Sequence, residues 1–460
     1  MRREGIILGI FNHELKIDTK NPFKDDKLKR EGEIKNLTNL FNVVGNQMVM
    51  AINSPWGTGK TSFLKMWESY LKNEGYNTVF FNCWENDFVE DPFIAFVEEI
   101  KSELTLQNKD LITPSFIEKA KEIISKTPRK VGNVVYNVTT DIIENKCGVD
   151  FKNATEDKKA EDSSVTKDIS NYNDVKKSLY DFKKELSSIA EKCGENPLII
   201  FVDELDRCRP NFAIEVLERI KHVFNVENII FILGIDKEAL SNSIKIIYGE
   251  NTKVNGYLNR FIDLEANLQS NEYTNKEYIK YLLECDKFEF KLILDSCSVG
   301  FLVFENICIN TLNIFNFPYR ELEKIVTRLY FVLKSTDLNS SLEIRMLTFL
   351  IGLNFYDKGE YIKFKEKNIT TDEIFKNISR NNFVQEDNDI RILAAICMIF
   401  LDERIENDKK DVPIQNMDDL VKDDIKKWYN QQLTDYTEKN IKKNTNDIIK
   451  AIDVFRNFIN

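Results

Sequence analysis

Apolar residues in the first 268 positions follow two alternating patterns. In one, they form near-continuous runs typical of strands buried on both faces, at 48–52, 78–82, 198–202 and 228–233. In the other, apolar side chains recur every three or four residues, which predicts helices, as at 34–44, 63–71 and 212–224. Strands alternating with helices predict an α/β fold, a parallel sheet with helices on both faces and ligands at the strands' carboxyl ends.

One segment, 108–173, interrupts this alternation. It contains two helix-like pieces and a charged tract at 154–168 that has almost no apolar residues, so we expect a mobile loop there. After it, apolar residues again step by threes and fours from Val175 to Ile189, which predicts a helix with a narrow apolar stripe. We therefore interpret 108–173 as a helical or disordered insertion into the sheet domain.

Beyond position 268 the pattern is helical only. Apolar faces recur in short stretches, at 276–285, 317–334, 344–355, 389–401 and 445–458. These predict an all-helical C-terminal domain. The chain then divides into the first part of the sheet domain, the insertion, the second part of the sheet domain and the helical domain, at 1–107, 108–173, 174–268 and 269–460.

The segment 54–62, SPWGTGKTS, lies between the first predicted strand and a helix, and it fits the phosphate-loop pattern GxxxxGK[ST] except at its first position. Gly57 and Gly59 let backbone amides approach a polyphosphate. Lys60 would reach the β- and γ-phosphates, and the Thr61 hydroxyl would bind Mg²⁺. Ser54 replaces the first glycine, and a small residue is tolerated there. The expected nucleotide-binding residues are Ser54, Pro55, Trp56, Gly57, Thr58, Gly59, Lys60, Thr61 and Ser62.

Two acids, Asp203 and Glu204, directly follow the apolar run at 198–202. In a phosphate-loop enzyme, the acid that ends such a strand holds Mg²⁺, and an adjacent glutamate orients and deprotonates the attacking water. We assign these roles to Asp203 and Glu204. Glu204 and Lys60 are then the catalytic candidates.

Four further residues each have two interpretations. Asp236, after the run at 228–233, either senses the γ-phosphate or caps the following helix. Arg260 is either a trans-acting arginine in an oligomer or a surface arginine. Arg320 is either a nucleotide-sensing arginine of a helical lid or a residue that caps a helix or forms a salt bridge. Arg30 either approaches the nucleotide or belongs to a solvated charged turn.

Composition narrows the functional classes. The net charge of −11 argues against a broad nucleic-acid surface, although a local basic strip stays possible. The eight cysteines show no CxxC spacing, so neither a zinc site nor a disulfide framework is indicated, and reduced thiols predict a cytoplasmic protein. The most apolar segment, 392–401, is shorter than the roughly 20 residues of a membrane span, so we interpret it as a buried helix.

Taken together, these motifs resemble the KAP family of P-loop NTPases. The resemblance rests on SPWGTGKTSFL, FNCWENDFVEDPF, IIFVDELDRCRP, FILGIDKEAL and YLNRFIDL, which occur in this order over about residues 20–265. It implies an ASCE-type P-loop core with an insertion between the two phosphate motifs. Family insertions often carry membrane helices, which this sequence lacks. Bacterial relatives often act as ATP-driven regulators in mobile-element or anti-phage systems.

The resulting expectation is a Mg²⁺-dependent ATPase whose cycle changes the conformation or assembly of the protein and so regulates a partner. ATP rather than GTP is implied by the family resemblance alone. We expect a homo-oligomer, a separate effector protein, or both, because the sequence contains no nuclease, protease or deaminase signature. A slow nucleotide-gated oligomerisation switch is the first alternative. A DNA-transaction motor is the second.

Overall fold

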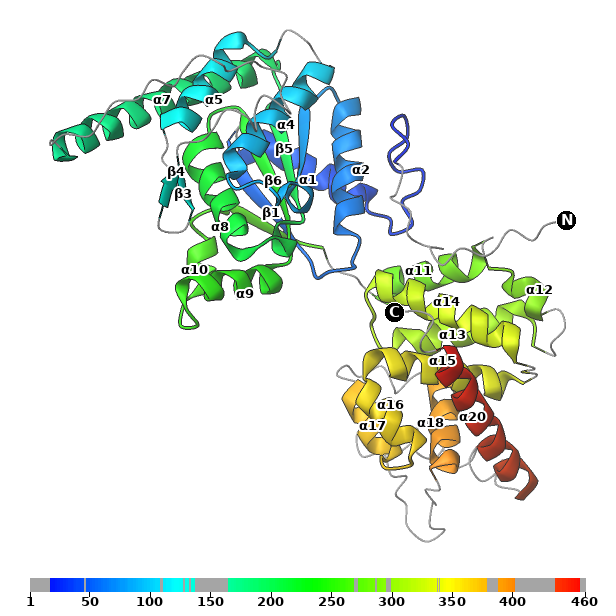
Figure 1. The fold of residues 1–460 in the computed structure, drawn as a ribbon. Coiled ribbons are helices and arrows are strands. Elements are labelled where there is room, and N and C mark those ends of the chain that lie inside the picture. The colour runs from blue at the N-terminus through cyan, green and yellow to red at the C-terminus, as the bar shows by residue number, and fades with distance from the viewer. Residues whose placement is uncertain are drawn as a thin grey trace, which may run out of the picture. The chain divides into compact units, whose positions relative to one another are not determined.

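The structure is a computed structural model that describes residues 17–44, 47–107, 111–126, 129–131, 134–136, 164–268, 272–285, 288–294, 299–336, 338, 340–378, 388–401 and 435–455. These residues form two compact units. The first, which we call the sheet unit, comprises 17–26 and 30–269. The second, the helical unit, contains 27–29 and the described residues from 270 onward (Figure 1).

A parallel five-stranded sheet organises the sheet unit, in the spatial order β2-β5-β6-β1-β7. Its strands are β1 (Met48–Asn53), β2 (Thr78–Asn82), β5 (Leu198–Asp203), β6 (Ile229–Ile235) and β7 (Leu264–Asn267). β6 pairs with both β1 and β5, so one strand separates the strand before the phosphate loop from the strand that ends in Asp203. This order confirms the predicted ASCE-type P-loop fold.

Helices cover both faces of the sheet, as the buried strands predicted (Figure 1). Met48, Met50 and Ile52 point to one face, where they share a core with α1 (Glu31–Val44) and α2 (Lys60–Asn73). Val49 and Ala51 point to the other face. That core includes helices α4 (Pro92–Gln107), α5 (Pro114–Lys126), α7 (Ser164–Lys192), α8 (Pro210–Arg219) and α9 (Lys237–Tyr248).

Several local features differ from the sequence-based expectations. The helix α7 begins at Ser164, so the expected loop at 154–168 is wrong for its last five residues, while 154–163 lie outside the described part of the chain. A helix anchored by buried residues further along can extend through polar positions, which explains the early start. An antiparallel hairpin, β3 (Arg129–Val131) with β4 (Val134–Tyr136), was not predicted. The expected helix at 212–224 becomes a π-helix, η2, over Ile220–Phe224.

Short elements complete the sheet unit. A single helical turn, α3 (Cys83–Asn86), follows β2 and is capped by the Asn82 side chain, which accepts a hydrogen bond from the Glu85 amide. A 3₁₀ turn, η1 (Leu205–Arg207), follows β5. The helix α10 (Val254–Leu258) precedes β7. The turns α3 and η1 both lie at the carboxyl edge of the sheet, and η1 contacts the phosphate loop through Asp206.

The helical unit packs around α15 (Ser341–Tyr356), which buries residues on every side. Its N-terminus carries a capping box, in which Ser340 and Glu343 exchange side-chain and backbone hydrogen bonds. The other helices are α11 (Glu272–Glu284), α12 (Phe290–Leu294), α13 (Phe301–Asn313), α14 (Tyr319–Ser335), α16 (Lys358–Lys365), α17 (Thr371–Ile378), α18 (Asn388–Phe400) and α20 (Asp435–Phe455). The all-helical architecture of this region is therefore confirmed.

The segment 392–401 lies mostly in α18, and its apolar side chains belong to the core of the helical unit. This confirms its interpretation as a buried helix. Among the residues that the structure describes, no helix combines the length and the apolar character that crossing a membrane requires.

We expect the aromatic cluster beneath the sheet to hold α7 in place. The Phe182 ring lies 5.2 Å from the rings of Phe93 and Phe116 and 5.8 Å from that of Phe224. Phe182→Ala should cost about 3–5 kcal/mol of unfolding free energy, because it removes a fully buried ring from a packed cluster. Calorimetry of the full chain would measure this loss. Tyr180→Ala is the matched control on the same helix, since Tyr180 is 69% exposed, and an equal loss in both variants would contradict the assignment.

Candidate functional site

The phosphate loop forms a tight turn between β1 and α2. Gly57 and Gly59 have φ angles of 81° and 85°, in the left-handed region that glycine adopts without strain. Gly59 immediately precedes Lys60, the first residue of α2. The loop therefore leads into the N-terminus of a helix of 14 residues, where backbone amides and the helix dipole favour an anion.

Ser54, at the position where the motif has glycine, fits the loop without strain. Its side chain is buried, with the hydroxyl 2.5 Å from Thr58 Oγ1 and donating to the Leu268 carbonyl oxygen at 3.2 Å. Its amide donates to the Ile235 carbonyl oxygen at 3.0 Å. The serine thus joins the loop to the ends of the two strands that flank β1, and the contact with Leu268 is one that a glycine could not make.

Lys60 is buried among carboxylates. Its Nζ donates to the Ser54 carbonyl oxygen at 2.9 Å and lies 3.8 Å from Asp206 Oδ1. Burial lowers the pKa of Lys60, and the charges of Asp206, Asp203 and Asp236 oppose that shift. The amine is therefore held at the loop by acids from three different positions at the carboxyl edge of the sheet.

Asp203 ends β5 and is almost fully buried. Burial raises its pKa, while the nearby Thr61 hydroxyl and the Glu204 amide, which donates to Oδ1 at 2.9 Å, act in the opposite direction. Within the described part of the chain, Asp203 Oδ2 has no hydrogen-bond partner. A buried carboxylate oxygen without a partner, next to a threonine hydroxyl, fits Mg²⁺, which takes one or two protein carboxylates and completes its shell with water and phosphate.

Glu204 has an unusual backbone. Its φ of 60° and ψ of 26° place a non-glycine residue in the left-handed region, a strain that is concentrated at functional sites. Its carboxylate forms an ion pair with Arg207, with Oε1 2.9 Å from Nη1. In this conformation Glu204 is next to Asp203, but its side chain is engaged by the arginine three residues later.

Asp206 is the residue that the sequence analysis missed. Its side chain is only 1% exposed, Oδ2 accepts a hydrogen bond from Trp56 Nε1, and Oδ1 is the oxygen nearest Lys60. The signal was present in the sequence, because a second aspartate stands three residues after Asp203. A 3₁₀ turn after the strand is what returns it to the phosphate loop, and the sequence pattern did not predict that turn.

The structure confirms Asp236 as a helix cap and adds a contact with the phosphate loop. Its Oδ1 caps α9 by accepting hydrogen bonds from the amides of Glu238 and Ala239, both at 3.1 Å. Its Oδ2 accepts from the Trp56 amide at 3.2 Å. Asp236 therefore fixes the phosphate loop relative to β6 while it serves as a helix cap.

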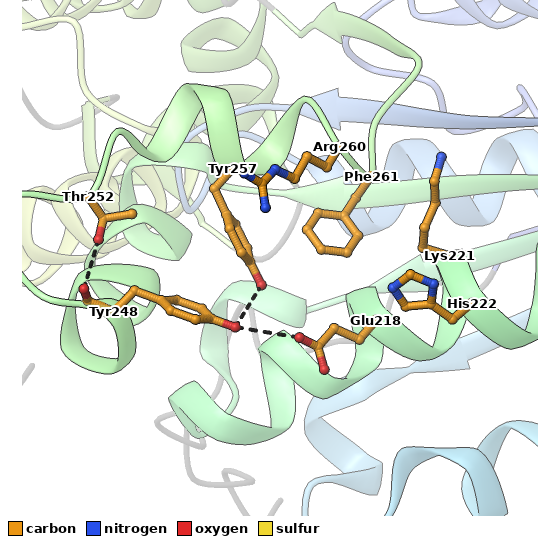
Figure 2. Close-up of a pocket in the computed structure, with 8 residues that line it drawn as sticks. All are labelled: Glu218, Lys221, His222, Tyr248, Thr252, Tyr257, Arg260 and Phe261. Carbon is orange, nitrogen blue, oxygen red and sulfur yellow. Dashed lines mark hydrogen bonds between the residues drawn. The ribbon is translucent and has the colours of Figure 1, made fainter. Parts of the chain in front are cut away.

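Arg260 is exposed on the sheet unit and lines a pocket of about 580 Å³ between α10, η2 and the end of α9 (Figure 2). Glu218, Lys221, His222, Tyr248, Thr252, Tyr257 and Phe261 complete the lining. Tyr257 and Tyr248 share a hydrogen bond at 3.4 Å, and Tyr248 donates to Glu218 at 3.5 Å. None of these residues belongs to the phosphate loop. The pocket that Arg260 lines is therefore separate from the phosphate loop.

The two remaining arginines lie in different settings. Arg320 is exposed in the first turn of α14, in the helical unit. Arg30 is 2% exposed, and its Nη1 donates to both carboxylate oxygens of Glu33, at 2.8 and 2.9 Å. The interpretation of Arg30 as part of a solvated turn is therefore wrong, because the guanidinium is buried against α1.

A sequence model described as the KAP family P-loop domain matches residues 30–336, more than half of the chain. The chain belongs to the KAP family of P-loop NTPases. Membership in this family and the ASCE sheet order imply nucleotide binding at the loop described above. No curated protein matches the KAP-family chain.

Solved structures add little to this assignment. One match is the structure of the Aeropyrum pernix ORC2 protein, described as ADPNP-ADP complexes, with 12% sequence identity and a TM-score of 0.30. It covers 94% of the KAP-family chain and 99% of the ORC2 chain. So low a TM-score supports no inference about this protein.

Close packing behind the loop makes Gly234 of this KAP-family protein critical. A Cβ added to Gly234 on β6 would lie 2.5 Å from Leu64 Cδ1, 2.8 Å from Asp203 Oδ1 and 3.5 Å from Lys60 Cγ. Any side chain there would displace the Leu64 side chain of α2 or the Asp203 carboxylate. The strand beneath the loop must therefore lack a side chain at this position.

Gly234→Ala should weaken nucleotide binding at least tenfold and lower the unfolding free energy by about 1–3 kcal/mol, because it overpacks the site. Titration with a fluorescent ATP analogue and thermal unfolding would measure the two effects. Gly256→Ala is the control, since nothing lies within 4 Å of an added Cβ there. Wild-type affinity in Gly234→Ala would show that the loop yields to the extra methyl group.

Proposed function

We propose that this protein is a Mg²⁺-dependent ATPase whose cycle of binding and hydrolysis changes its conformation or assembly and so regulates a partner protein. The observation that supports this best is the meeting of Lys60, Thr61, Asp203 and Glu204 at one edge of the sheet. Each residue type matches one requirement of phosphoryl transfer, and two sequence segments far apart in the chain supply them.

In the proposed reaction, the loop amides at the start of α2 bind the phosphates and Lys60 offsets charge on the β- and γ-phosphoryl oxygens. Thr61 and Asp203 would hold Mg²⁺, which neutralises the developing phosphate charge when it is bound. Glu204 would orient a water molecule in line with the γ-phosphate and accept its proton. For this, its carboxylate must leave Arg207, so breaking that ion pair is a step of the proposed cycle.

ATP, rather than GTP, follows from the family kinship. So does the biological setting that we propose, control of a separate effector in anti-phage defence. The exposed position of Arg260, away from its own phosphate loop, favours an oligomer in which this arginine completes a neighbour's site. An assembly switch with very slow turnover uses the same residues and differs only in rate, so it is the second candidate function.

Glu204→Gln should keep ATP binding and reduce turnover by about 10²–10⁴-fold, the usual contribution of a general base. The amide keeps the size of the side chain but cannot accept the proton of the water. Steady-state phosphate release and equilibrium binding of labelled ATP would separate the two properties. An unchanged steady-state rate in this variant would remove Glu204 from the mechanism.

The assembly part of the proposal predicts a nucleotide-dependent mass. Size exclusion with light scattering should show a larger particle for the wild type with Mg²⁺ and a non-hydrolysable ATP analogue than without them. Lys60→Ala should stay at the smaller mass, because it loses the phosphate contact. Arg260→Ala should bind nucleotide normally and lose turnover in the assembled state. Equal turnover in Arg260→Ala and wild type would contradict a role in a neighbour's site.

A further inference from the structure

Asp206 lies beside Lys60, the one cation of the phosphate loop. The ammonium of Lys60 lies 3.8 Å from Asp206 Oδ1, and that oxygen has no hydrogen-bond partner among the residues that the structure describes. A buried charge without compensation is costly, so Lys60 is the group that makes a charged Asp206 tolerable. The proposed function requires the same ammonium to contact the β- and γ-phosphates.

The other oxygen of Asp206 is occupied by the phosphate loop itself. Trp56, in the middle of the loop, donates its indole Nε1 to Oδ2, while its ring is 52% exposed. Its amide is held separately by Asp236. One carboxylate therefore contacts the loop lysine and the loop tryptophan together, and η1 carries this carboxylate directly after the strand that ends in Asp203.

We propose that Asp206 is an acidic latch, a positioning residue that holds Lys60 and Trp56 in the nucleotide-free protein and opposes nucleotide binding until the phosphates draw Lys60 away. This inference rests on the proposed function, because it assumes that the loop binds a nucleoside triphosphate. Two effects act in the same direction. The carboxylate competes for the ammonium, and its negative charge repels the incoming phosphates through a poorly screened interior.

The latch also connects the loop to the catalytic acid. Arg207, the residue after Asp206 in η1, pairs with Glu204 at 2.9 Å. When Lys60 moves away from Asp206, a positive charge is lost next to η1. The electrostatic environment of the adjacent ion pair between Glu204 and Arg207 then changes. Residues 204–207 therefore contain both the carboxylate that holds Lys60 and the ion pair that holds Glu204. Nucleotide binding at Lys60 and release of Glu204 from Arg207 are linked through this one short segment.

Two substitutions separate the charge of Asp206 from its hydrogen bond. Asp206→Asn removes the charge and keeps an oxygen that accepts from Trp56 Nε1, so it should bind the Mg²⁺ complex of a non-hydrolysable ATP analogue at least threefold more tightly than wild type. Trp56→Phe keeps the charge and an aromatic ring but removes the donor, which leaves the carboxylate free to engage Lys60 more strongly. It should bind the analogue more weakly. A residue with a merely structural role would weaken binding in both variants.

Isothermal titration of the full chain measures these affinities, and thermal unfolding confirms that each variant is folded. Glu238→Gln is the matched control for the loss of one negative charge, because Glu238 is exposed in the first turn of α9 beside the site, and it should bind as wild type does. A threefold gain in affinity confined to Asp206→Asn supports the latch. Measurable binding by Asp206→Asn when the wild type shows none also supports it. Equal or weaker binding by folded Asp206→Asn, with wild type binding, overturns the latch and leaves the proposed function intact. No binding by either protein overturns both.

Discussion

A buried ammonium group among carboxylates is the constraint on which the rest of the sheet unit depends. Lys60 is desolvated at the start of α2, and the charges that offset this come from Asp203 at the end of β5, Asp206 in η1 and Asp236 at the end of β6. These acids meet only because β6 lies between β1 and β5 and all three strands are parallel. This arrangement of charge depends on the sheet order, on the glycine at position 234 and on the two hydrophobic cores that cover the faces of the sheet.

The parts of this arrangement that depend on local sequence could be predicted. Near-continuous apolar runs identified four of the five strands, and β2 has the predicted bounds, because such strands must bury both faces. The phosphate loop and the acid pair after β5 were found from residue type and spacing, since their chemistry tolerates few substitutes. The family could be inferred from the same residues.

The features that could not be predicted from the sequence depend on contacts that form only in the folded protein. Asp206 counts for little in the sequence pattern and matters only because a 3₁₀ turn brings it back to Trp56 and Lys60. The double role of Asp236 required knowing that the loop amide of Trp56 lies within reach of a helix cap. The hairpin of β3 and β4 has strands of three residues each, too short to show a periodicity. The placement of Arg260 in a pocket away from the loop likewise follows from α10 and η2, not from its neighbours in sequence.

Ser54 gives the phosphate loop a mechanical property that the standard glycine lacks. Its hydroxyl holds the carbonyl of Leu268, and the sheet unit ends at the very next residue, Gln269, after which the chain continues into the helical unit. The loop is therefore fastened to the point where the polypeptide leaves the sheet. A movement of the loop away from this point would have to stretch or break the hydrogen bond of Ser54, a constraint that a glycine at position 54 would not impose.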